Sequence, residues 1–128
     1  MKIYLSDDSI LQNIAFGSDI DSIDRSKVQE IIKKVKLEDL ILSLPDGLDN
    51  KIGERGVRIS GGQSQRLGIA RIMYQEREII ILDEATSALD KNTEKEVLNG
   101  LFKNIENKTF IIIAHRKETI EKCENLFE

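Results

Sequence analysis

The 128-residue sequence contains one cysteine, one proline, one histidine and no tryptophan, and these scarcities exclude several classes of protein. Cys123 alone forms neither a disulfide framework nor a metal-ligand cluster, which fits a reducing, cytosolic setting. With four phenylalanines and two tyrosines, the chain has few platforms on which nucleic-acid bases stack. The 19 basic and 23 acidic residues give a net charge of −4, which also argues against a nucleic-acid partner.

Long apolar runs are missing as well. The runs IIIL and FIIIA are far shorter than the roughly 20 residues that cross a bilayer. The first nine residues lack the apolar centre of a secretion signal. If the protein acts at a membrane, another chain or segment must therefore supply the membrane part. The length itself predicts one domain or part of one.

The hydrophobic period of the chain changes near its middle. In the first half, apolar residues recur at helical spacing, and the predicted helices span residues 9–17, 24–37, 38–44 and 60–74. Gly17 marks the expected end of the first helix, and Asp24 is the expected cap of the second. Pro45 breaks the third helix and opens a predicted loop over residues 45–56. The second helix is expected to bury Val28, Ile31, Ile32 and Val35.

The second half combines two strands with a helix. Residues 78–82 contain an apolar run of three β-branched isoleucines and a leucine, which is typical of a strand buried on both faces of a parallel sheet. An amphipathic helix over 92–105 and a second apolar run over 109–114 follow. This order predicts a parallel βαβ unit and an α/β fold, with ligands at the carboxyl ends of the strands. The helix is expected to turn inward Val97, Leu98, Leu101, Phe102 and Ile105.

Two adjacent glycines lie at the start of the fourth predicted helix, between Ser60 and Gln63. The serine and the glutamine fit a capping box, in which each side chain accepts a backbone N–H of the first turn. The box does not explain Gly61 and Gly62, because each glycine costs roughly 1 kcal/mol relative to alanine in a helix. Glycines there suit the close approach of a phosphate to bare N–H groups. Phosphate binding therefore stands beside plain capping as an interpretation.

Charged or titratable side chains follow both predicted strands. The first strand ends in Asp83 and Glu84, and the second ends in His115. An ordinary strand-to-helix turn explains the acidic pair by itself, and a solvated or core position explains the histidine. Together, at neighbouring strand ends, the three predict one crevice. There one carboxylate holds Mg²⁺, the other orients or deprotonates a water, and the imidazole bonds a terminal phosphate or that water.

Taken in order, the motifs SGGQ, IIILDE, SALD and IAHR resemble those of the nucleotide-binding domain of ATP-binding-cassette (ABC) proteins. Residues 60–63 match the signature loop, and Asp83 with Glu84 matches the end of Walker B. Residues 87–90 match the D-loop, and His115 matches the switch histidine. GERG at 53–56 resembles the X-loop of ABC exporters, and residues 3–17 resemble the exporter segment after the Q-loop. The resemblance covers essentially the whole chain and implies a P-loop NTPase fold.

The resemblance also implies that ATP and Mg²⁺ are bound between two partners. In this family two such domains pair head to tail, as a homo- or heterodimer, and each signature loop closes on the ATP held by the other. The residues that would face the γ-phosphate in trans are Ser60, Gly61, Gly62 and Gln63. Asp90 would lie at the dimer seam.

Within the same domain, Asp83 would serve Mg²⁺, Glu84 would act as general base and His115 would contact the γ-phosphate. The helical half and the X-loop would pass the closing motion to the transmembrane domain of an exporter. The resemblance thus implies an ATPase that powers export, at the cytoplasmic face of a cell membrane.

The family's phosphate loop, GxxxxGK[ST], is not found, since none of the eight glycines precedes a lysine. The Q-loop glutamine and the aromatic residue that stacks on adenine are also expected upstream, and residues 124–128 look like the opening of another strand. The sequence is therefore interpreted as the carboxyl-side portion of a domain, with a helical subdomain over 1–75 and part of the catalytic α/β core over 76–128. Alone, it is expected to bind ATP poorly, to hydrolyse it negligibly and to expose an apolar sheet face.

Two other readings stay open. One is the carboxyl-terminal lobe of a split ABC ATPase of the DNA-repair or chromosome-maintenance kind. The GERG motif, the amphipathic helices before it and the acidic charge count against that reading. The other is a non-catalytic module that keeps the fold and only docks on a partner, which would not need Glu84 or His115.

Overall fold

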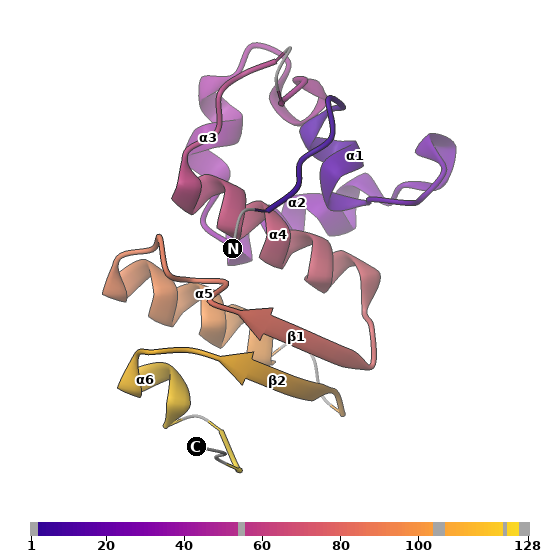
Figure 1. Cartoon of the computed structure of the whole chain (residues 1–128). Coiled ribbons are helices and arrows are strands. Elements are labelled where there is room, and N and C mark those ends of the chain that lie inside the picture. Colours follow the sequence, from indigo (N-terminus) through magenta and orange to yellow (C-terminus); the bar gives the residue numbers. More distant parts are fainter. Residues whose placement is uncertain (1–2, 54–55, 104–106, 122, 126–128) are drawn as a thin grey trace.

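The computed structural model describes residues 3–53, 56–103, 107–121 and 123–125. Four helices come first and an alternation of strands and helices follows (Figure 1). The helices are α1 (Ile10–Ile14), α2 (Arg25–Lys34), α3 (Glu38–Ser43), α4 (Gly61–Gln75), α5 (Lys91–Lys103) and α6 (Lys117–Ile120). The strands are β1 (Ile79–Asp83) and β2 (Thr109–Ile113), and single 3₁₀ turns form at η1 (Ile20–Ser22) and η2 (Gly47–Asp49).

The predicted helix starts are confirmed, and the ends are less accurate. Asp24 caps α2 by accepting a hydrogen bond from the backbone N–H of Lys27 at 3.0 Å. The first helix ends at Ile14, earlier than predicted, while Gly17 lies beyond it with a φ of +86°. A φ in this region is one that glycine adopts at little cost. The glycine therefore belongs to the turn after the helix and is not the residue at which the helix ends.

The predicted loop over 45–56 contains one structured turn, η2, that the sequence did not indicate. The backbone N–H of Asp46 donates to the side-chain oxygen of Asn50 at 2.7 Å. Leu48 is buried in the main core cluster. Because burying one leucine stabilises by about 2 kcal/mol, this short segment folds onto the helices instead of remaining open.

One buried apolar cluster joins the helical first half to the strands and α5. Its most deeply buried large members come from both halves: Ile10, Ile14, Val28, Val35, Leu37, Ile52, Leu67, Ile69, Val97 and Leu101. The predicted inward face of α2 is confirmed, since Val28, Ile31 and Ile32 are buried. The proposed division at residue 75 stays a prediction, and the core runs across that boundary.

The predicted βαβ unit is confirmed. β1 and β2 pair in parallel, with Ile79 opposite Thr109 and Asp83 opposite Ile113, and α5 connects them. The fold is therefore α/β, as expected. The predicted inward residues Val97, Leu98 and Leu101 are buried, while Phe102 is partly buried with its ring centroid 5.0 Å from that of Phe110. Ile105 lies outside the described residues.

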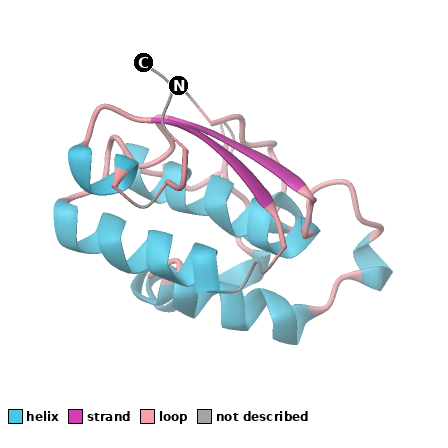
Figure 2. Ribbon diagram, turned by 90° about the horizontal axis from the view of Figure 1, so that it is seen from below, coloured by secondary structure: helices cyan, strands magenta, loops and turns pink. Residues whose placement is uncertain are grey.

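The prediction that the first strand is buried on both faces is wrong for the described chain. Ile80 and Leu82 are buried, whereas Ile79 and Ile81 are 65% and 62% exposed. In β2 the same alternation exposes Ile111 and Ile113 on the same side, because the strands are in register. Most of the helices lie on one side of the two strands (Figure 2). The expected apolar sheet face is thus confirmed.

Glu124 and Asn125 lie in a bend, and the rest of the predicted final strand lies outside the described residues. Among the helices that the structure describes, none is long and apolar enough to span a bilayer.

Candidate functional site

The carboxyl ends of the two strands bring Glu84 and His115 together. The backbone N–H of Glu84 donates to the carbonyl of Ile113 at 2.9 Å, which extends the strand pairing by one step. The His115 Nε2 then lies 3.0 Å from the Glu84 Oε1. The predicted meeting of the two strand ends is therefore seen directly in the geometry.

Glu84 has a left-handed backbone conformation, with a φ of +47°. A non-glycine residue in this region costs of order 1–3 kcal/mol and persists where its surroundings fix it. Here the carbonyl of Glu84 accepts from the backbone N–H of Ser87 at 3.1 Å and from the Gln65 Nε2 at 3.2 Å. The strained backbone turns the chain sharply after β1 and leaves the carboxylate beside His115.

Asp83 is the last residue of β1 and is half-buried. In the described part of the chain, no group of three or more His, Cys, Asp or Glu side chains is placed to hold a metal ion. Mg²⁺ usually takes one or two carboxylates and completes its shell with phosphate and water oxygens. A single strand-end carboxylate therefore fits the protein's share of a magnesium–nucleotide site.

The helix α4 begins with the predicted capping box. The Ser60 Oγ accepts from the backbone N–H of Gln63 at 3.2 Å, and the Gln63 Oε1 accepts from the backbone N–H of Ser60 at 2.9 Å. Gly61 and Gly62 belong to the first turn of α4, so their backbone N–H groups have no intrahelical carbonyl partner. These two donors, at the positive end of a 15-residue helix, suit an anion.

The two glycines have different surroundings. A Cβ atom on Gly62 would lie 3.2 Å from the carbonyl oxygen of Ala88 and 3.3 Å from the Leu89 side chain. A Cβ atom on Gly61 would meet only the Ala88 Cβ, at an ordinary 3.7 Å. Gly62 therefore lets α4 pack against residues 87–90, hereafter the SALD turn. Packing within the chain gives no such reason for Gly61, which is exposed.

Paired alanine substitutions separate these two cases. We expect Gly61→Ala to leave the free energy of unfolding unchanged or to raise it by up to about 1 kcal/mol, since alanine is the better helix former. Gly62→Ala is expected to be less stable than Gly61→Ala by about 1 kcal/mol, because the Ala88 carbonyl must shift. Urea unfolding of the two variants measures the difference, and equal stabilities would contradict the close packing.

Gln65 holds α4 to the turn after β1, a role that was not predicted from the sequence. Its buried side chain donates to the Ser87 Oγ at 2.9 Å and accepts from the backbone N–H of Ala88 at 2.8 Å. Together with its bond to the Glu84 carbonyl, this amide connects α4 to the candidate site. The sequence carries one indication of this role, because Gln65 is a polar residue four positions before Ile69, within the apolar stripe of the helix.

Asp90 has a structural role that was not predicted from the sequence. Its Oδ1 accepts from the backbone N–H groups of Asn92 and Thr93, at 3.1 and 3.0 Å, and so caps α5. Hydrogen bonds from Thr93 and Asn92 lower the pKa of this carboxyl below its usual range. The dimer-seam role of Asp90 stays a prediction. Within the GERG motif, Glu54 and Arg55 lie outside the described residues.

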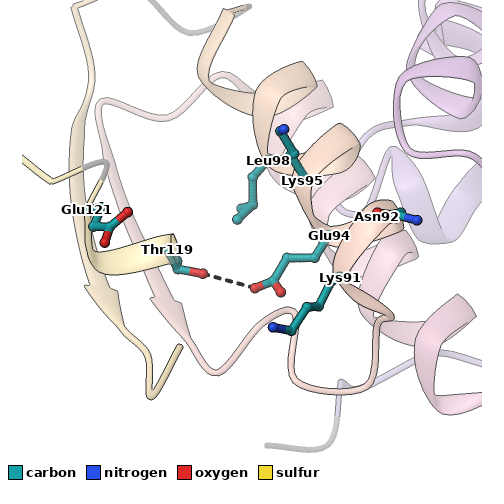
Figure 3. Close-up of a pocket in the computed structure, with 7 residues that line it drawn as sticks. All are labelled: Lys91, Asn92, Glu94, Lys95, Leu98, Thr119 and Glu121. Carbon is teal, nitrogen blue, oxygen red and sulfur yellow. Dashed lines mark hydrogen bonds between the residues drawn. The ribbon is translucent and has the colours of Figure 1, made fainter. Parts of the chain in front are cut away.

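A hollow of about 500 Å³ lies between α5 and α6 (Figure 3). Its lining is mixed in charge and consists of Lys91, Asn92, Glu94, Lys95, Leu98, Thr119 and Glu121. Neither Glu84 nor His115 lines it.

Comparison with known proteins agrees with this geometry. Residues 3–87 match the family model described as ABC transporter. The chain is 44% identical over 124 residues to an ATP-dependent lipid A-core flippase of Burkholderia orbicola (strain AU 1054), a match that covers 97% of this chain and 20% of the flippase. It is 43% identical over 119 residues to the multidrug resistance protein sirA of Leptosphaeria maculans, covering 93% of this chain and 9% of that protein.

A solved structure agrees as well. The structure of a bacterial Atm1-family ABC exporter with ATP bound superposes with a TM-score of 0.82 at 39% sequence identity. The match covers 95% of this chain and 21% of the exporter chain. The chain thus spans about a fifth or less of the length of these similar proteins.

Proposed function

Because the chain belongs to the ABC transporter family, we propose that it forms part of the ATP-hydrolysing domain of an ABC exporter. The observation that carries the proposal is the 3.0 Å contact between Glu84 and His115 at the ends of two parallel strands. This geometry presents a base and a hydrogen-bonding imidazole to the same point in space. The names of the similar proteins, flippase and exporter, favour export over the split ATPase of DNA repair.

In this proposal three side chains divide the work on ATP. The Glu84 carboxylate takes a proton from the attacking water, His115 hydrogen-bonds the γ-phosphate, and Asp83 gives an oxygen ligand to Mg²⁺. When bound, Mg²⁺ neutralises charge on the phosphate oxygens. The strained backbone at Glu84 fixes the position of its carboxylate before the reaction, so the side chain needs little rearrangement to reach the water.

The start of α4 is proposed to serve a second nucleotide-binding domain. Ser60, Gly61 and Gln63 are not buried, and the first-turn N–H groups of the two glycines would stabilise an incoming γ-phosphate. Two domains paired head to tail would then each complete the site of the other, with Asp90 at the seam. The transmembrane domain of the exporter would hold the pair at the cytoplasmic face of the membrane.

A transplant tests the function of these residues. The matching 124 residues of the Burkholderia orbicola flippase are replaced by this chain, and ATP hydrolysis is measured in the purified hybrid. We expect hydrolysis within about tenfold of the parent flippase, because one factor of ten is only 1.4 kcal/mol of barrier. A hybrid that folds and binds ATP but does not hydrolyse it would overturn the proposal.

The 128-residue chain by itself is proposed to be inactive. It has no GxxxxGK[ST] loop to hold the phosphates in cis, so calorimetric titration with Mg·ATP should show no binding up to about 1 mM. Tight magnesium-dependent binding would mean that other residues of this chain hold the phosphates, and the proposed arrangement would be wrong.

A further inference from the structure

His115 and the residue that follows it, Arg116, differ in how firmly they are held. The imidazole side chain is 85% exposed, and Glu84 is its one ionic contact among the described residues. Arg116, by contrast, is anchored. Its guanidinium donates to the carbonyls of Leu89 at 3.0 Å and Ser87 at 3.3 Å, both in the SALD turn. It also forms an ion pair with the Glu94 carboxylate.

Glu94 is the buried centre of this arrangement. Its Oε1 accepts from the Thr86 Oγ1 at 2.6 Å and from the Thr119 Oγ1 at 3.0 Å, and its Oε2 pairs with Arg116 (Figure 3 shows the bond to Thr119). The donors come from the turn after β1, from the link after β2 and from α6, while Glu94 belongs to α5. One carboxylate thus joins segments that are far apart in sequence.

The charge of Glu94 is retained despite its burial. Burial alone raises the pKa of this carboxyl, but hydrogen bonds from Thr86, Arg116 and Thr119 and the charge of Arg116 together lower it. The carboxylate is therefore ionised at neutral pH. Every buried polar side-chain atom in the described residues has a hydrogen-bond partner, so the network is complete as it stands.

We propose that Glu94 is a positioning residue for His115. Through Arg116 and Thr119 it fixes the segment after β2, and through Thr86 it fixes the turn after β1, so that His115 and the SALD turn move as one unit. The functional meaning rests on the proposed contact of His115 with ATP. The packing of α4 on the SALD turn would then help to set the position of the histidine.

The histidine itself provides the test, because the chain contains only one and its imidazole gives a single set of NMR signals. In the full chain, Glu94→Gln is expected to shift and broaden these signals. It should also speed hydrogen exchange at the Leu89 and Thr119 amides by about tenfold or more, since a charged hydrogen-bond partner is lost. The control is Glu96→Gln on the same helix, which removes an exposed pair with Lys36 at 3.2 Å and should change neither readout.

A purely structural role predicts a different result, in which exchange rises equally in α4 and at Leu89. That result, or unchanged imidazole signals, would overturn the proposal. Arg116→Lys provides a second variant that keeps the charge beside Glu94 but loses the forked contact to the two carbonyls. It should reproduce the shifted imidazole signals, and failure to do so would also count against positioning. Since no nucleotide is used, these outcomes are read independently of whether the chain serves an ATPase.

Discussion

Substituting Glu84 with glutamine is expected to lower ATP hydrolysis by at least about 100-fold in the flippase that carries this chain, because a general base contributes about 10²–10⁴-fold. Glutamine has nearly the same shape and can still accept a hydrogen bond, but it takes up no proton at neutral pH. The affinity for ATP should therefore change little. Steady-state hydrolysis and nucleotide binding, measured on the same preparation, separate the two effects.

Glu78→Gln is the matched control, because this exposed glutamate immediately precedes β1, at the opposite end of the strand. It should leave hydrolysis unchanged. The glutamine at position 84 has the same backbone preferences as glutamate, so the left-handed φ is no harder to adopt. If Glu84→Gln hydrolysed ATP at the parental rate, another group would be the base, and the assignment from the strand ends would be wrong.

Features that depend on neighbouring residues, or on the order of strands and helices along the chain, were predicted well from the sequence. The caps at Asp24 and Ser60 each need a side chain and an N–H three residues away, and both formed as expected. The βαβ unit followed from the apolar pattern of residues 78–114 and from the order strand, helix, strand. Parallel pairing then required the ends carrying Glu84 and His115 to meet, since parallel strands share one carboxyl edge.

Features that depend on distant partners were not predicted. Gln65 and Glu94 are polar residues on largely apolar helix faces, and nothing within a few positions of them identifies their partners, which lie 8 to 25 residues away. The hydrogen-bond partners of these two side chains became known only with the fold. The wrong prediction that Ile79 and Ile81 are buried has a different cause. An apolar pattern reports what a strand is suited to contact, and the described residues do not include a cover for that face.

The exposed isoleucines make self-association the second large expected effect. Ile81 and Ile111 lie side by side in the register of the two strands and are 62% and 49% exposed. Replacing both with threonine keeps β-branched side chains but removes apolar surface from the face. If each lost contact is worth about 1 kcal/mol, the four contacts in a symmetric pair sum to about 4 kcal/mol, which weakens self-association by roughly 1,000-fold. Sedimentation velocity across a concentration series measures the change.

Self-association through the sheet face has an alternative, which is nonspecific association through any exposed apolar side chain. A substitution at Leu42 distinguishes these two explanations. This side chain is 83% exposed on α3, more than either isoleucine, and it does not belong to the sheet. If association simply followed exposed apolar area, Leu42→Thr would weaken it as much per residue as the sheet variants. We expect no measurable change, because a lone exposed leucine is ordinary whereas four isoleucines on adjacent strands form a continuous apolar surface. An equal effect from Leu42→Thr would mean that the sheet face is not where the copies meet.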